Sequence, residues 1–242
     1  MDALQTLREM SDVELSRRSG VSRSTLHRIE TGVASPTLRT LRELAIAAGV
    51  DIDVSIKTLS DLYASRASRF LLDSAFHNVP LTRADQEWME RLTRVSADDP
   101  VAIVAQAGHA STVFAAPGAV FVKDSFAPLR LASAGDATGG PWAVSGRAGL
   151  EAIAHSADTP LAGPDIVYVV DPHHAWRLLE SPATTTTAEK AMTIIAPWHE
   201  HLAVDVWEVG AVRYVAPLQV LLDCVGLGGE VAETALDIAR RW

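Results

Sequence analysis

Arginine, serine and histidine side chains gather between residues 22 and 28, and these residue types suit contact with DNA. Arginine can donate two hydrogen bonds to one guanine, and hydroxyl and imidazole groups can donate to base edges or phosphates. We therefore predict base contacts from Ser22, Arg23, Ser24, His27 and Arg28. Arginines elsewhere in the first 42 residues can neutralise phosphate charge, and the predicted phosphate contacts are Arg17, Arg18, Arg39 and Arg42.

Two short helices joined by a tight turn are needed to present these side chains. Gly20 is predicted to end the first helix, because glycine adopts the left-handed conformation without steric cost. Ser22 is predicted to cap the second helix, its hydroxyl accepting backbone N–H groups that lack an intrahelical partner. The apolar residues that would hold the two helices at a fixed angle are Leu15, Val21, Leu26 and Ile29.

The order of these residues resembles the XRE/Cro-type helix-turn-helix family. The matching positions are Glu14-Leu15, Gly20-Val21-Ser22, Thr25-Leu26, Ile29-Glu30 and Gly32, followed by Ser35-Pro36 and Leu38-x-x-Leu41 where the family has its fourth helix. The resemblance covers residues 1–56 and implies an all-α, lambda-repressor-like domain that binds double-stranded DNA. Because one recognition helix reads few base pairs, we expect a homodimer on an inverted repeat. The alternative is a helical hairpin without a DNA role.

One position departs from the family pattern. Asp12 stands where the family usually has a glutamine that touches the phosphate backbone. A carboxylate there is repelled by phosphate, although it suits the positive end of a helix dipole. The effect of Asp12 on DNA contact therefore stays open at this point.

Charge is divided unevenly along the chain. The 242 residues carry a net charge of −9, yet residues 12–42 hold six arginines against three acidic residues. From Ser60 onward, 13 basic residues stand against 22 acidic ones, so only the N-terminal end suits phosphate. The single cysteine, Cys224, excludes a disulfide framework, and no apolar run approaches membrane-spanning length. We expect a folded, cytoplasmic protein.

Composition and turn signals predict a multi-domain chain: a helix-turn-helix domain over 1–54, a helical connector over 55–99 and a mixed α/β effector domain over 100–242. In the first region we expect a helix over 2–10, another that begins at Ser35-Pro36, and a strand or extended exit over 50–54. In the connector, Trp88, Leu92 and Val95 form an apolar helical stripe.

In the α/β region, strands are predicted over 101–107, 119–122, 142–146, 166–170, 192–196, 204–209 and 212–215. A loop is predicted over 133–141, and helices over 147–155 and after Pro217.

Three C-terminal segments carry a second resemblance: Trp142 to Glu151, Ile166 to Val170, and Val215 to Asp223 with the glycine-rich turn and Glu230-Val231 after it. Their order is similar to the C-terminal domain of AbiEi-type antitoxins of type IV toxin–antitoxin systems, over residues 142–242. The resemblance implies a repressor of its own operon that counters a nucleotidyltransferase-like toxin protein. The alternative is a free-standing repressor that responds to a ligand or partner.

Catalysis is the third alternative, because the strand, the Ser145-Gly146 turn and the following helix are similar to the start of a nucleotidyltransferase site. Such a site needs paired carboxylates, usually Asp-x-Asp, to hold two metal ions. The next acidic residues lack that spacing: Glu151, Asp158, Asp165 and Asp171. We predict that the chain is not an enzyme.

Two histidine clusters have the residue types of a zinc or nickel site. They are His173-His174 and His199-Glu200-His201, with Asp205 nearby. The second cluster is not H-E-x-x-H, because position 203 is alanine, and adjacent histidines point in different directions. We predict solvent-exposed or core histidines, with no metal and no cofactor.

Overall fold

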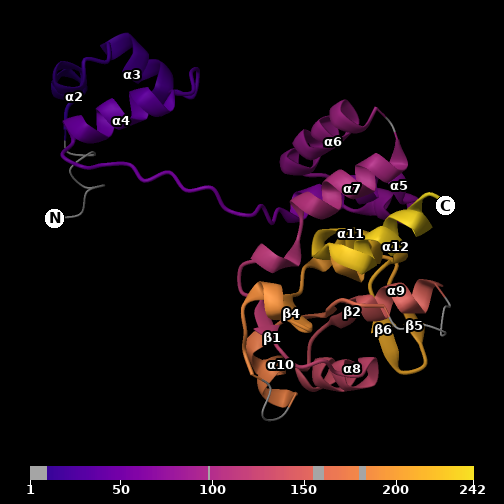
Figure 1. Cartoon of the computed structure of the whole chain (residues 1–242). Coiled ribbons are helices and arrows are strands. Elements are labelled where there is room, and N and C mark those ends of the chain that lie inside the picture. The colour runs from indigo at the N-terminus through magenta and orange to yellow at the C-terminus, as the bar shows by residue number, and fades with distance from the viewer. Residues whose placement is uncertain (1–9, 98, 155–160, 180–183) are drawn as a thin grey trace. The chain divides into compact units, whose positions relative to one another are not determined.

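The computed structural model describes residues 10–97, 99–154, 161–179 and 184–242 (Figure 1). Contacts divide the chain into two units, Met1–Lys57 and Thr58–Trp242. The first is helical and the second contains a mixed α/β sheet, which confirms the predicted fold class. The helix predicted over 2–10 lies outside the described residues except for Met10.

The first unit contains the two predicted helices, α2 (Asp12–Ser19) and α3 (Arg23–Glu30). Gly20 follows α2 with a φ of 70°, so this glycine ends the helix in the left-handed conformation, as predicted. The Ser22 hydroxyl caps α3 by accepting a backbone N–H of its first turn at 3.2 Å. Leu26 is buried between the helices, with 3% of its surface exposed.

The next helix, α4 (Leu38–Ala47), begins later in the chain than the Ser35-Pro36 signal predicts. Its cap is Thr37, because Thr37 Oγ1 accepts the backbone N–H of Thr40 at 3.1 Å. Leu38, which matches the family pattern at the start of this helix, is 64% exposed. Residues 51–59 then run exposed with neither helix nor strand, so the strand alternative for 50–54 is wrong.

Helices also open the second unit, in the region predicted as a connector. α5 (Leu62–Leu72), a 3₁₀ turn (Ser74–Asn78) and α6 (Arg83–Ser96) pack on one another and on the next helix. These helices therefore belong to the same unit as the sheet. Of the predicted stripe on α6, Leu92 is buried but Val95 is 63% exposed.

The next helix, α7 (Pro100–Ala110), lies where the sequence predicts a strand over 101–107. Asp99 accepts the backbone N–H of Val101 at 3.0 Å, and Pro100 occupies the first helical position, where proline loses no hydrogen bond. A short apolar run has the same composition in a buried strand and in a buried helix, which is why the prediction was wrong.

Within the described residues, six strands form one sheet in the order β1-β4-β3-β2-β6-β5. β3 pairs antiparallel with β2 and parallel with β4, and β2 pairs parallel with β6. The strands lie within the predicted strand segments or shifted from them by one residue: β1 (Val120–Val122), β2 (Trp142–Gly146), β3 (Asp165–Val169), β4 (Thr193–Pro197), β5 (Trp207–Val209) and β6 (Val212–Tyr214).

Helices cover both faces of the sheet (Figure 1). One face packs against α8 (Pro128–Ala137) and α10 (Pro172–Leu178), and the other against α11 (Pro217–Leu227) with α7 beside it. α9 (Arg147–Ala154) and α12 (Gly229–Ala239) lie against α11. None of the helices in the described parts of the chain is long and apolar enough to span a bilayer.

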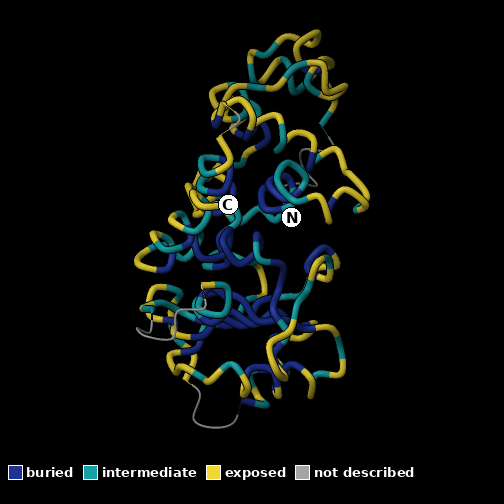
Figure 2. Tube along the Cα trace, turned by 90° about the vertical axis from the view of Figure 1, so that its right-hand side faces the viewer, coloured by how far each residue is buried: buried dark blue, intermediate teal, exposed yellow. Residues whose placement is uncertain are grey.

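Both faces of the central strands β2, β3 and β4 are buried, as Figure 2 shows by the dark blue of the tube there. Along β3, Val167 and Val169 face α8 and α10, whereas Ile166 and Tyr168 face α7 and α11. This alternation follows from the two-residue repeat of a strand, and it divides the core of the second unit into two layers.

α8 replaces most of the loop predicted over 133–141. Pro128 occupies the first helical position, and Gly135 lies inside the helix because the Trp142 ring packs directly on it. A Cβ on Gly135 would lie 2.6 Å from Trp142 Cγ. Gly135, a residue type typical of loops, thus provides room for the Trp142 side chain of β2.

Candidate nucleic-acid interface

α3 turns its apolar residues inward and its polar residues to solvent. Leu26 is buried and Ile29 is half-buried. Every residue predicted to contact bases is exposed: Ser22, Arg23, Ser24, His27 and Arg28. A short capped helix with hydrogen-bond donors on one open face can enter the major groove, where each base pair presents its own pattern of donors and acceptors.

A chain of hydroxyl groups lies at the N-terminal end of α3. The Ser22 Oγ lies 2.9 Å from Ser24 Oγ and 2.8 Å from Thr25 Oγ1. The partial positive charge of a helix N-terminus favours an anion, so these hydroxyls suit a phosphate. Thr25 is exposed beside them and is a further candidate for this contact beyond the residues predicted from the sequence; its position three residues after the cap is the sequence signal for it.

Two of the predicted phosphate contacts are already engaged with a carboxylate. Arg17 donates from Nε and Nη2 to the two oxygens of Glu14, at 3.1 and 2.8 Å, and Arg18 Nε donates to Glu14 Oε1 at 2.6 Å. Hydrogen bonds from Arg17 and Arg18 lower the pKa of Glu14 to about 2. Ser11 caps α2 by accepting the backbone N–H of Glu14 at 3.3 Å, while the Glu14 side chain binds these arginines.

The remaining arginines are more available. Arg42 Nε lies 3.8 Å from Asp51 Oδ1, and both side chains are exposed, so this pair is weak. Among the described residues no ion pair is found for Arg23, Arg28 or Arg39, and all three are exposed. These guanidinium groups can bind bases or phosphates without first breaking an ion pair with a carboxylate.

Asp12 begins α2 and is exposed. With Glu14 it places two carboxylates in the first turn of this helix, where they suit the helix dipole. The first turn of α2 therefore carries negative charge, and positive charge for phosphate contact must come from the last turn and from α3 and α4.

Two helices fixed by a tight turn, with a capped and exposed second helix, define the first unit as a helix-turn-helix DNA-binding domain. Comparison with known families agrees, because residues 2–55 match the family described as helix-turn-helix. The match supports a DNA-binding transcriptional regulator with an XRE-type N-terminal domain. No curated protein and no solved structure matches the chain. The resemblance of residues 142–242 to AbiEi-type antitoxins stays a prediction.

The described histidines of the second unit do not converge as metal ligands. No group of three His, Cys, Asp or Glu side chains within the described ranges is arranged to hold a metal ion. His199 and His201 stack with ring centroids 5.8 Å apart, whereas His173 and His174 lie in the first turn of α10.

Proposed function

We propose that the protein is a sequence-specific transcriptional repressor that binds operator DNA through α3. The observation that carries the proposal is the exposure of Arg23, Ser24, His27 and Arg28 on one capped helix. Arg23, Ser24 and Arg28 contact bases, with His27 beside them, and Ser22 touches a phosphate. The phosphate backbone is held by Arg17, Arg18, Arg39 and Arg42. A homodimer on an inverted repeat doubles the few base pairs that one α3 can read.

Selection of bound sequences from a random duplex library, followed by binding measurements on single-base variants, tests this proposal. Arg23→Ala or Arg28→Ala should lose about 1–3 kcal/mol of discrimination at one base position. Arg39→Ala, the matched control on α4, should weaken binding to all sequences alike and reduce the salt dependence. The proposal fails if Arg23→Ala and Arg28→Ala discriminate every base as the original chain does.

The finer role we propose is that of a type IV antitoxin. The three segments that resemble AbiEi-type antitoxins form β2 with α9, β3, and α11, and these elements pack on one another. That supports reading them as one folded module. Co-expression with the product of the adjacent gene should relieve growth arrest caused by that product. Unrelieved arrest in cells that contain the folded protein favours a free-standing regulator instead.

We also propose that the second unit binds a partner or ligand and does not catalyse nucleotidyl transfer. Glu151 and Asp165, two of the acidic residues that follow the Ser145-Gly146 turn in the sequence, both bind Arg147. Arg147 Nη2 lies 2.5 Å from Asp165 Oδ2, so a guanidinium occupies the place between the two carboxylates. Incubation with nucleoside triphosphates and Mg²⁺ should give no turnover, and turnover that is lost in Asp165→Asn would contradict this.

A further inference from the structure

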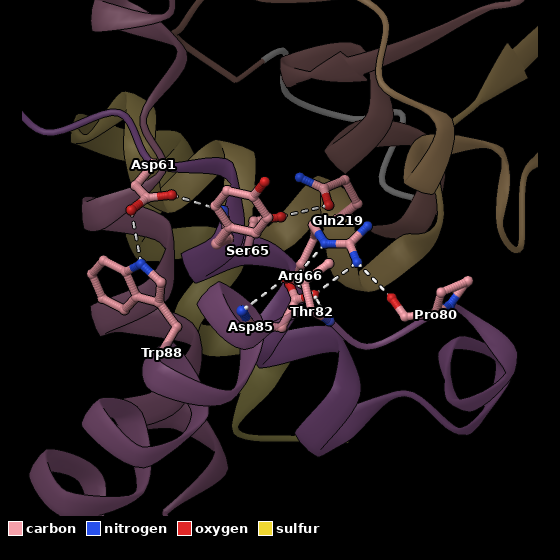
Figure 3. A network of polar contacts seen from close by, with 9 residues as sticks. Asp61, Ser65, Arg66, Pro80, Thr82, Asp85, Trp88 and Gln219 are labelled. Atoms are coloured by element: carbon pink, nitrogen blue, oxygen red, sulfur yellow. Dashed lines mark hydrogen bonds and ion pairs between the residues drawn. The ribbon is translucent and has the colours of Figure 1, made fainter.

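A cavity of about 410 Å³ lies inside the second unit. Its walls come from residues 59–63, α5, the loop after α7, the end of β4 and α11. The volume lies within the range of small-molecule sites in proteins. Polar groups from separate elements converge on it: Asp61, Ser65, Tyr168, His201, Gln219 and Asp223. Figure 3 shows part of this wall, with Ser65 directed at Gln219 and Asp61 at the start of the same helix.

The most deeply buried carboxylate of this cavity is Asp223, which is 4% exposed. It accepts hydrogen bonds from Ser145 Oγ at 2.5 Å, Gln219 Nε2 at 2.9 Å and the Tyr168 hydroxyl at 3.0 Å. Burial raises the pKa of Asp223 to about 6, so the carboxylate is mostly ionised at neutral pH. All three donors are neutral, and a buried negative charge with neutral partners is costly.

Cations near the cavity are already paired. Arg66 donates to both oxygens of Asp85, and Arg69 to Asp73 Oδ2. No lysine or arginine is among the described residues that line the cavity, whereas a second carboxylate, that of Asp61, is. The lining therefore carries carboxylates without a cation, and the Arg69 guanidinium, bound to Asp73, acts on Asp223 from outside the lining.

His201 supplies an unused polar group. The side chain lines the cavity, is 6% exposed, and its ring nitrogens have no hydrogen-bond partner among the described residues. Desolvation, with the nearby charge of His199, Arg66 and Arg69, lowers the pKa of His201 to about 3. The neutral imidazole offers one donor and one acceptor to a molecule in the cavity.

Apolar side chains make up the rest of the lining. They include Leu62, Val113, Ala116, Pro117 and Leu202. We propose that the cavity binds a small organic cation, an amine or amidine joined to an apolar or aromatic body. The cationic group faces Asp223, the body lies against the apolar wall, and His201 completes a hydrogen bond to the ligand. This binding does not depend on the DNA-binding role of the first unit.

Calorimetric titration of the full chain tests the proposal with two matched pairs of probes: tryptamine against indole-3-acetate, and benzamidine against benzoate. At least one cation should bind with one-to-one stoichiometry, and its matched carboxylate should bind at least tenfold more weakly. The proposal is overturned if neither cation binds, or if the carboxylates bind as tightly.

Variants locate the site. Asp223→Asn should weaken cation binding at least tenfold, whereas Glu233→Gln, which removes an exposed charge on α12, should leave it unchanged. Because Asp223→Asn changes a buried group, Ala116→Trp is the second variant: it fills the cavity from a half-buried position and leaves the polar cluster intact. Cation binding that persists in Ala116→Trp places the ligand elsewhere and refutes the assignment.

Discussion

Replacing Glu14 by glutamine should change how the protein responds to salt when it binds DNA. In the free protein one carboxylate holds both Arg17 and Arg18, with contacts of 2.6 to 3.1 Å. The Glu14 carboxylate competes with a phosphate for both arginines, because it occupies some of their donor groups and offsets their charge. Glu14→Gln removes the competing charge and leaves both guanidinium groups free, while the cap from Ser11 acts through the backbone N–H of residue 14 and remains.

The magnitude follows from counterion release. Each phosphate neutralised contributes about 0.9 to the slope of log K against log salt, so two released arginines steepen the slope by up to about 1.8 per domain. Between about 50 and 200 mM salt, the affinity advantage of Glu14→Gln over the original chain should therefore shrink roughly tenfold. Fluorescence anisotropy on a mixed-sequence duplex measures this, because non-specific binding reports phosphate contacts.

Glu43→Gln is the matched control for this measurement. It removes the same charge from the same unit, at an exposed residue of α4 for which no ion pair is found among the described residues. Its slope should stay that of the original chain. An unchanged slope in Glu14→Gln would refute the idea that Glu14 restrains the two arginines, and equal changes in both variants would mean that overall charge alone is responsible.

Two further predictions concern the second unit. Burial raises the pKa of Asp223 from 3.8 to about 6, so the native state binds more protons than the unfolded state in this window, and stability falls as pH rises from about 4 to 6. Urea unfolding of the original chain should show a free energy of unfolding that falls by about 3 kcal/mol more over this pH range than that of Asp223→Asn. The same pH dependence in both proteins would contradict this prediction. Gly135→Ala should cost about 1–3 kcal/mol, because its Cβ would meet Trp142. Ser133→Ala, exposed on the same helix, should be neutral or slightly stabilising in thermal unfolding.

Much of the first unit could be predicted because its signals are local. Gly20 and Ser22 act through the backbone conformation and the hydrogen bonds of their own turn, so their roles depend on neighbours within three or four residues. The exposed face of α3 follows from the helical period once Leu26 is placed inside. The ion pairs of Glu14 with Arg17 and Arg18 could also have been predicted from spacing, because residues three and four apart on a helix are neighbours.

The second unit was harder to predict where a residue's conformation depends on what packs against it. The apolar run Val101 to Ala107 fits a buried strand or a buried helix; the local cap at Asp99 and Pro100 favours the helix, and packing against α11 and α5 buries it. In the sequence Gly135 favours a loop. In the structure the ring of Trp142 occupies the space where a side chain at position 135 would lie.

The helix pair of the first unit can be predicted from the chain alone, because caps, turns and helical faces depend on residues close together in the sequence. The cavity around Asp223 cannot, because it depends on packing between distant segments. Its partners Ser145 and Tyr168 lie 78 and 55 residues away, and Ser65 reaches Gln219 across 154 residues. No spacing along the chain encodes such a cluster, because it forms only when the sheet and its covering helices bring distant segments to one point.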